Sequence, residues 1–415
     1  MRRILEAGIF SIGVILFLLG ISLKLPYSLI QVHLLMGTVF KTALIVLGLV
    51  VMVLPVVSFF SEKGILAHQK FRASVINDTI LLGSLLVSFV LLEILLHVTM
   101  PSGCRIPDEI MHHTYQPGCS YTFRTSEWST QVHINSGGLR DDEPLANPDF
   151  RILVLGSSFV RGYGVEQNET FPELLQRKFN EAGAKTEVIN AGITSYSPIL
   201  EYLYLKYKGL SYKPDMIILT FDMADLNSDF EFEKIAVFDN DALVSVPSGK
   251  TDSLLEYIYL KLRTPRLIES LLSRVAISPK APPNDVRYDK YAITREEISL
   301  NESAHWNRTF SYIGKIKNLS NATFILISYP YGHQVSGTEW GEGRRNYGFE
   351  PGKIYSSRAD NILREYAKRN NIPYISLFDA FRESNEPGLY FPYDGHFTAA
   401  GHALAADVLF KELNT

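Results

Sequence analysis

Two widely separated segments of the chain hold side chains that could together activate a hydroxyl group. Ser158 follows a short apolar run that ends in glycine, while Asp394 and His396 stand near the C-terminus with one glycine between them. A histidine can deprotonate a serine near neutral pH, and a carboxylate fixes the imidazole tautomer and stabilises its charged form. Ser158, His396 and Asp394 are therefore the candidate catalytic residues. Taken alone, the Ser158 segment is more typical of an ordinary turn or helix cap, and the Asp394–His396 segment is more typical of a turn with a surface histidine.

The elements that must position these residues follow an alternating pattern. Apolar runs predict five strands, at residues 152–155, 188–189, 216–221, 324–329 and 374–378. Segments between and after them predict helices, at residues 171–179, 198–208, 357–369 and 403–413. Such alternation indicates a parallel sheet with helices on both faces, in which ligands bind at the carboxyl ends of the strands. Ser158 stands directly after the first strand, where a helix start offers amide protons to developing negative charge.

Together these segments resemble the SGNH/GDSL hydrolases. The first motif of that family is Gly-Asp-Ser with a glycine-rich turn, and this chain has Gly156-Ser157-Ser158 followed by two further glycines. The last motif is Asp-x-x-His or, in relatives that acetylate polysaccharides, Asp-x-His, and this chain has Asp394-Gly395-His396. The resemblance covers residues 150–413. It implies an α/β fold, a flavodoxin-like three-layer α/β/α domain with a parallel sheet, and hydrolysis or transfer of acyl groups through an acyl-serine.

Two positions depart from the family pattern. The resemblance places Ser195 where the family has a glycine whose amide serves the oxyanion hole, so the amides of Ser158 and Ser195 are the expected donors. The third motif of the family supplies an asparagine side chain, but Ala224 stands at that position and has no donor. Loss of one such donor typically costs about 10²–10³ in rate. Asn190 and Asn227 are the nearest candidates for a replacement.

The candidate substrate-binding residues are Arg140, Asn190 and Asp225. Arg140 ends a segment that resembles an Asn-x-x-Gly-x-Arg sequence of membrane-linked family members. It either reaches the substrate or packs the preceding segment onto the main domain, and packing is the favoured interpretation. His112 and His113 lack a third ligand at a useful spacing, so they are interpreted as surface residues. No metal and no cofactor is expected.

The sequence predicts that residues 99–150 form an extracytoplasmic connector. This connector contains a β hairpin with strands at residues 120–124 and 131–135. The connector precedes the hydrolase-like domain, which runs from residue 151 to residue 415. The only two cysteines of the chain, Cys104 and Cys119, lie in the connector. A disulfide between them is favoured over two unpaired thiols, and it implies an oxidising compartment.

The sequence predicts that residues 1–98 form a transmembrane region with three helices. Three apolar runs, at residues 7–23, 42–61 and 79–98, have about the 20 residues that a helix needs to cross ~30 Å of hydrocarbon. For the first run, a cleavable signal peptide is the alternative. Basic residues concentrate before the first run and between the second and third, which predicts that these parts face the cytoplasm. After three crossings, the C-terminal domain is expected outside the cytoplasm, with the lipid bilayer as a partner.

The composition and the motifs together limit the kinds of function that the chain can have. A net charge of −4, without a basic tail, gives no indication of a nucleic-acid partner. The sequence predicts a membrane-anchored serine esterase or O-acyltransferase that acts on acyl esters, with O-acetyl groups of cell-envelope glycans as the favoured substrate. A lipid esterase or thioesterase is one alternative. Another is a degenerate SGNH scaffold that binds a glycan or a protein partner without turnover, which Ala224 supports.

Overall fold

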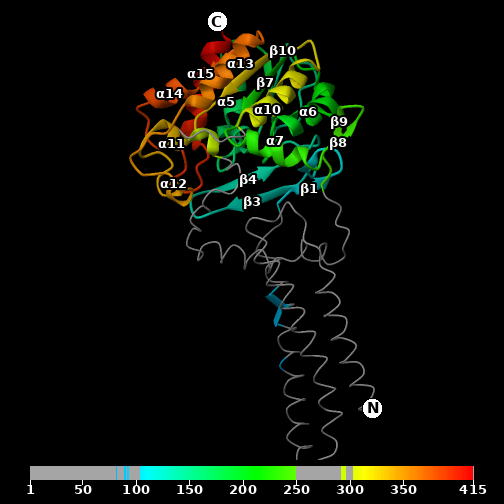
Figure 1. Cartoon of the computed structure of the whole chain (residues 1–415). Coiled ribbons are helices and arrows are strands. Elements are labelled where there is room, and N and C mark those ends of the chain that lie inside the picture. The colour runs from blue at the N-terminus through cyan, green and yellow to red at the C-terminus, as the bar shows by residue number, and fades with distance from the viewer. Residues whose placement is uncertain are drawn as a thin grey trace, which may run out of the picture. The chain divides into compact units, whose positions relative to one another are not determined.

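The structure is a computed structural model that describes residues 103–248, 291–295 and 302–414, together with Leu81, Ser88, Phe89, Leu91 and Leu92. The chain forms two compact units. One comprises residues 1–102 and 249–280, and the other comprises residues 103–248 and 281–415. All of the candidate chemistry lies in the second unit, whose described residues form the coloured ribbon from β1 to α15 in Figure 1.

A five-stranded parallel sheet forms the centre of this second unit. Its strands are β5 (Phe150–Gly156), β6 (Thr186–Gly192), β7 (Met216–Phe221), β10 (Thr323–Ser328) and β11 (Tyr374–Ser376). They lie in the order β11-β10-β7-β5-β6, and every neighbouring pair is parallel. Their largely aliphatic sequences are typical of strands that are buried on both faces. The predicted parallel α/β sheet is confirmed.

Two groups of helices cover the sheet. The first group consists of α5 (Phe171–Glu181) and α15 (Ala399–Leu413), which pack against each other. The second group consists of α6 (Pro198–Tyr207), α7 (Asp225–Glu233), α10 (Glu302–Lys317) and α13 (Arg358–Arg369). Stacking of Tyr366 on Phe310, at 3.9 Å between ring centroids, joins α13 to α10. Right-handed crossovers between parallel strands require the two groups to cover opposite faces.

Shorter elements complete the unit. The short helices are α4 (Ser158–Arg161), α11 (Gly332–Val335), α12 (Gly343–Asn346), α14 (Phe378–Glu383), η3 (Gln167–Glu169), η4 (Gly209–Tyr212) and η5 (Ala292–Thr294). A hairpin of β8 (Val237–Asp239) and β9 (Ala242–Ser245) follows α7. The sequence also predicts helices around residues 254–262 and 267–275, and both lie outside the described residues.

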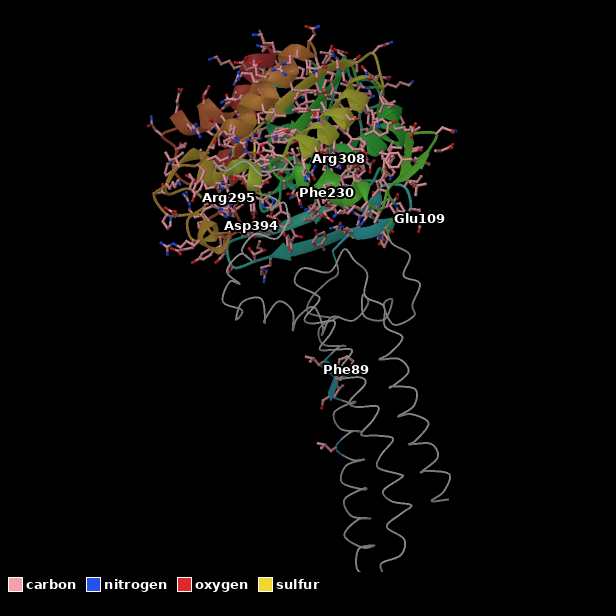
Figure 2. All side chains as sticks on the ribbon, viewed as in Figure 1. Phe89, Glu109, Phe230, Arg295, Arg308 and Asp394 are labelled. Carbon is pink, nitrogen blue, oxygen red and sulfur yellow. A yellow bond between two sulfur atoms is a disulfide. The ribbon has the colours of Figure 1, made fainter. Side chains whose placement is uncertain are left out.

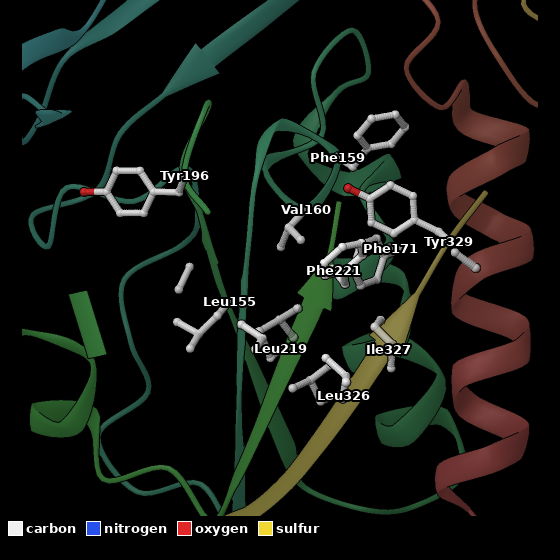
Figure 3. Packing of buried hydrophobic residues seen from close by; sticks show 14 of the residues in the cluster. Leu155, Phe159, Val160, Phe171, Tyr196, Leu219, Phe221, Leu326, Ile327 and Tyr329 are labelled. Carbon is white, nitrogen blue, oxygen red and sulfur yellow. The ribbon is translucent and has the colours of Figure 1, made fainter. Parts of the chain in front are cut away.

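The hydrophobic core lies between the sheet and its helices. Leu155, Leu219 and Leu326 come from three adjacent strands and are fully buried, as Figure 3 shows. Burial of each such side chain contributes about 1.5–3 kcal/mol. Phe159 and Phe221 belong to the same cluster near the ends of the strands, where the candidate chemistry lies. The core therefore fixes the strand ends that carry the site.

The segment before β5 forms two antiparallel hairpins. The first pairs β1 (Arg105–Asp108) with β2 (His112–Tyr115), and the second pairs β3 (Ser120–Arg124) with β4 (Ser129–His133). The sequence predicted only the second hairpin, and both belong to the same compact unit as the sheet. Cys104 and Cys119 are joined by a disulfide, which ties the start of β1 to the start of β3.

The interpretation of His113 as a surface residue was wrong. Its ring is buried, and its Nε2 lies 2.8 Å from the carbonyl oxygen of Thr194. Burial, together with the charge of Arg105, lowers the pKa of His113 to about 3, so the ring is neutral. The first hairpin thus packs directly on the loop that follows β6.

The predicted membrane spans fall largely outside the described residues. Residues 7–23 and 42–61 lie wholly outside them, and the span at 79–98 is described at five helical positions only. Within the described part of the chain, no helix is long and apolar enough to cross a membrane.

Glu201 of α6 is a buried acid whose two carboxyl oxygens have no hydrogen-bond partner among the described residues. Burial, followed by the charges of Asp229 and Asp222, raises the pKa of Glu201 well above its ordinary value. The folded chain therefore holds the proton of this carboxyl group to a higher pH than the unfolded chain does. The contribution of this group to stability is complete below the unfolded pKa of about 4.5 and falls as the pH rises toward the folded pKa.

We predict that Glu201→Gln makes stability less dependent on pH between 5 and 8. Glutamine keeps the shape of the protonated acid but cannot ionise, so the loss of up to about 1.4 kcal/mol per pH unit should disappear. Urea unfolding followed by tryptophan fluorescence measures this, because all three tryptophans (Trp128, Trp306 and Trp340) lie in the second unit. Glu181→Gln, at an exposed position of α5, is the control. Equal pH dependence in wild type and variant would contradict the prediction.

Candidate active site

The nucleophile candidate stands at the junction of a strand and a helix. Ser158 is the first residue of α4, two positions after β5 ends, and it is half-buried. The preceding Ser157 caps the helix with extended backbone and is buried. Its hydroxyl donates to Oδ2 of Asp222 at 2.7 Å, on the carboxyl end of β7. Ser157 is thus bound toward the sheet, and Ser158 is the serine that meets the histidine.

The structure brings the three candidate catalytic residues together. Ser158 Oγ lies 2.7 Å from Nε2 of His396, although 238 positions separate the two residues. Nδ1 of His396 donates to the carboxylate of Asp394, and the amide of His396 donates to the same oxygen at 3.2 Å. Because Nδ1 faces a carboxylate, it carries the proton, and Nε2 is free to accept the proton of the serine.

Aromatic rings fix the plane of the imidazole. The rings of Phe159 and Tyr163 each lie 4.7 Å from the ring of His396, between centroids, and are tilted by 37° and 34°. Both residues come from the segment that begins with Ser158, so the same segment carries the nucleophile and packs against the base. Rotation of the imidazole away from Ser158 would break these contacts.

The loop after β6 presents the second expected oxyanion donor. Ser195 is exposed and has a φ of +67°, the left-handed conformation that favours glycine. This agrees with the position at which the resemblance expects glycine. The loop is held from the first hairpin, where the hydroxyl of Tyr115 donates to Oγ1 of Thr194 at 2.8 Å and accepts the amide of Thr194 at 3.1 Å. Among the described residues, no acceptor pairs with the amide of Ser158 or of Ser195.

Comparison with known proteins decides the family. The model of the GDSL-like lipase/acylhydrolase family matches residues 154–404, which is more than half of the chain. The chain belongs to this family. The resemblance to SGNH/GDSL hydrolases is thereby confirmed, and the protein is an ester hydrolase. A search of curated proteins found no match.

Solved structures similar to this GDSL-like hydrolase include three esterases or lipases. An acetyl xylan esterase is 14% identical over 64% of this chain and 100% of its own, with a TM-score of 0.37. The lipase/acylhydrolase from Enterococcus faecalis is 17% identical over 64% and 95%, with a TM-score of 0.34. A two-domain esterase active on acetylated mannans is 14% identical over 64% and 49%, with a TM-score of 0.33.

Asp222 joins the strand ends behind the site of the GDSL-like hydrolase. Its buried carboxylate accepts hydrogen bonds from Ser157, from Tyr329 at 2.7 Å and from Tyr331, and it also accepts the amide of Ala224 at 2.9 Å. These donors follow three different strands of the sheet. Asp222 directly follows the strand predicted at residues 216–221, and this place at the carboxyl edge of the sheet was the signal that could have identified it.

Two of the expected substrate contacts were wrong. Asn190 is buried in β6, where its side-chain amide donates to the carbonyl of Val160 at 2.9 Å and its oxygen accepts the amide of Gly192. Asp225 is buried at the start of α7 and accepts the amide of Asp222 at 2.9 Å. Both side chains are used within the fold, and Asn190 is therefore not available as a replacement for the missing oxyanion donor. Ala224 is half-buried and caps α7.

Arg140 packs the preceding segment onto the domain, as the favoured interpretation predicted. Its guanidinium is buried and donates to the carbonyls of Arg161, Gly162, Val165 and Gln131. Burial lowers the pKa of Arg140 to about 10, so it remains charged at neutral pH. Three of its four acceptors lie at the end of α4 or in the turn that follows it. Among the described residues, no group of three or more His, Cys, Asp and Glu is arranged to hold a metal ion.

Gly395 lies between Asp394 and His396, so a substitution there tests whether catalysis depends on the position of this turn. Its φ is +86°, and an added Cβ would lie 2.3–2.7 Å from the indole ring of Trp340. We predict that Gly395→Ala displaces Asp394 and His396 and lowers kcat by about 10²-fold, because a shift of about 1 Å in a reacting group has that effect. Ester hydrolysis measures the loss, and tryptophan fluorescence checks the fold.

Gly388→Ala is the matched control. Gly388 also has a positive φ, of +73°, but an added Cβ there meets no described atom within 4 Å. It should cost only the roughly 1–2 kcal/mol of a left-handed alanine and should leave kcat unchanged. Equal kcat in Gly395→Ala and wild type would show that the turn tolerates displacement.

Proposed function

We propose that this ester hydrolase removes or transfers O-acyl groups, chiefly O-acetyl groups, on cell-envelope glycans through an acyl-serine intermediate. The observation that carries the proposal is the 2.7 Å hydrogen bond between Ser158 Oγ and His396 Nε2. The imidazole is oriented on its other side by Asp394. This is the arrangement that an activated serine requires.

In the proposed reaction, Ser158 Oγ attacks the acyl carbonyl while His396 Nε2 accepts the hydroxyl proton. Asp394 stabilises the imidazolium that results, and the imidazolium then gives its proton to the departing sugar oxygen. The acyl-serine is released by water in a hydrolase or by a second sugar hydroxyl in a transferase. His396 accepts the proton of that second nucleophile and returns it to Ser158 Oγ as the acyl–serine bond breaks, so the same residues serve either outcome.

The negative oxygen of the tetrahedral intermediate is assigned to the backbone amides of Ser158 and Ser195. Ser158 begins α4, where the helix dipole also favours negative charge. The exposed loop of Ser195 offers the second amide. Two donors instead of three imply a slower reaction on small activated esters, by about 10²–10³-fold if no other group replaces the third.

The substrate class is inferred from the last motif and from the surface beside it. The Asp-x-His spacing of Asp394 and His396 matches the relatives that acetylate polysaccharides. Tyr393, the adjacent residue, is 59% exposed. A solvent-exposed aromatic ring offers a flat apolar face on which a sugar ring can pack. The N-terminal apolar runs of the sequence support anchoring in a membrane, with the catalytic unit outside the cytoplasm and close to envelope glycans.

One observation favours a second candidate function. Ala224 supplies no side-chain proton to an oxyanion, as expected of a degenerate scaffold that binds a glycan or a partner without turnover. Against it, Ser158, His396 and Asp394 lie at hydrogen-bond distance from one another.

We predict that Ser158 and His396 act as one unit. Ser158→Ala and His396→Ala should each lower kcat on the order of 10⁴-fold or more, and the double variant should be little worse, because catalytic partners are not additive. A fluorophosphonate probe should label wild type at Ser158 and neither variant. An acetylated oligosaccharide and a long-chain acyl ester, compared as substrates, distinguish the glycan proposal from a lipid esterase.

These measurements also separate the alternatives. Multiplicative losses in the double variant would mean that the two residues act independently. Absence of labelling at Ser158, with a folded protein, would favour the binding scaffold.

We predict that the C-terminus lies outside the cytoplasm. A reporter fused after Thr415 should be active only in the extracytoplasmic compartment, and one inserted at residues 62–78 only in the cytoplasm, because the basic residues there face inward. Mass spectrometry without reduction should recover Cys104 linked to Cys119. A cytoplasmic C-terminal reporter would remove the envelope-glycan substrate and favour an intracellular thioesterase.

A further inference from the structure

A glutamate of the second hairpin binds the turn that carries the acid and the base. Oε1 of Glu127 accepts the amide of Tyr393, and Oε2 accepts the amide of Asp394, each at 2.8 Å. Glu127 lies between β3 and β4, 266 positions before Tyr393. Figure 2 shows Asp394 on the side of the unit where these two strands run. Two hydrogen bonds from one carboxylate to consecutive amides fix both the position and the orientation of that peptide segment.

The hairpin itself holds Glu127 in this position. Oγ1 of Thr125 accepts the amides of Glu127 at 3.1 Å and of Trp128 at 3.2 Å, which closes the turn. Trp128 is buried, and its ring packs on Tyr163 at 5.2 Å and on Phe391 at 6.2 Å, between centroids. Tyr163 in turn packs on the imidazole of the base. The hairpin thus reaches the catalytic histidine by two routes, through backbone amides and through aromatic rings.

On its other side, the same turn is bound by Trp340. The indole of Trp340 donates to the carbonyl of Tyr393 at 3.2 Å, and its ring lies against Gly395. The Tyr393 side chain itself is exposed. Backbone contacts from Glu127 and Trp340 therefore determine where the Asp394 carboxylate points. Because Asp394 orients the imidazole of His396, a displacement of the turn would also displace Nε2 of that ring.

We propose that Glu127 is a positioning residue for the acyl-transfer reaction, and that the β3–β4 hairpin is part of the catalytic apparatus. Glu127 acts through Asp394, by holding its amide, and makes no contact with the reacting atoms. This inference rests on the proposed function of Ser158 and His396. It assigns to the connector segment a role in the chemistry as well as in the fold.

Three variants test the proposal in the full-length chain. Glu127→Ala removes both acceptors and should lower kcat about 10–100-fold with KM nearly unchanged, because a displaced base slows the chemical step without altering substrate contacts. Glu127→Gln keeps one acceptor and should lose less. Glu143→Gln is the matched control, since exposed Glu143 also accepts a backbone amide in the same segment, that of Ser136, far from the turn in sequence.

A double-variant cycle distinguishes positioning from general stabilisation. If Glu127 acts through Asp394, then Glu127→Ala should cost no more than about 2-fold in kcat when Asp394→Asn is already present. Full additivity in the cycle would overturn the proposal, as would unchanged kcat in Glu127→Ala. Equal losses in Glu127→Ala and in Glu143→Gln would also overturn it. Tryptophan fluorescence checks that each variant is folded. If Glu127→Ala does not fold, the same measurements are made with Glu127→Gln.

The rate of fluorophosphonate labelling separates this inference from the function on which it rests. Labelling of wild type at Ser158 with slower labelling of Glu127→Ala and Glu127→Gln supports both. Wild type that is labelled at the same rate as the Glu127 variants overturns only the positioning role. Wild type that is not labelled overturns the proposed function and this inference with it.

Discussion

The hydrogen bond between Ser158 and His396 is the constraint on which the rest of the structure depends, because its partners come from segments 238 positions apart. An error of about 1 Å at either end reduces reaction rates markedly. The sheet solves half of this problem: β5 lies in the interior of the parallel order and delivers Ser158 at its carboxyl end. The other half is harder, because the turn of His396 belongs to no strand or helix.

Two carboxylates hold the loop that carries His396 in place. Glu339 accepts the amides of Gly388, Leu389 and Tyr390. Three residues further along the same loop, the amides of Tyr393 and Asp394 donate to Glu127. Hydrogen bonds to charged groups contribute about 1.5–3 kcal/mol each, more than neutral ones, so a few of them can order a loop that lacks regular structure. The loop is thereby anchored from a hairpin and from the segment after β10, which are distant in sequence.

The sequence predicted what depends on local pattern and missed what depends on remote partners. Aliphatic runs indicated the five strands, β7 at its observed bounds, because strands that are buried on both faces are mostly aliphatic. The order of the motifs indicated Ser158 and His396. Asn190 was misjudged because a polar residue at a strand end can point into the cleft or into the fold, and periodicity does not distinguish the two. Glu127 carried no signal at all, since its partners are backbone amides, which every residue possesses.

Asp222 contacts two positions at which this chain differs from the family motifs, Ser157 and Ala224. In the first motif the family has aspartate where this chain has Ser157, and the hydroxyl of Ser157 donates to Asp222 at 2.7 Å. An aspartate at position 157 would place a second carboxylate against a buried one, which is unfavourable unless one of them is protonated. In the third motif Ala224 stands where the family has asparagine, and its amide donates to the same carboxylate. The hydroxyl of Ser157 and the backbone amide of Ala224 therefore both donate to Asp222, so this carboxylate joins the turn of the nucleophile to the start of α7. Any residue at position 224 would offer that amide, so the contact accounts for Ser157 and not for the alanine.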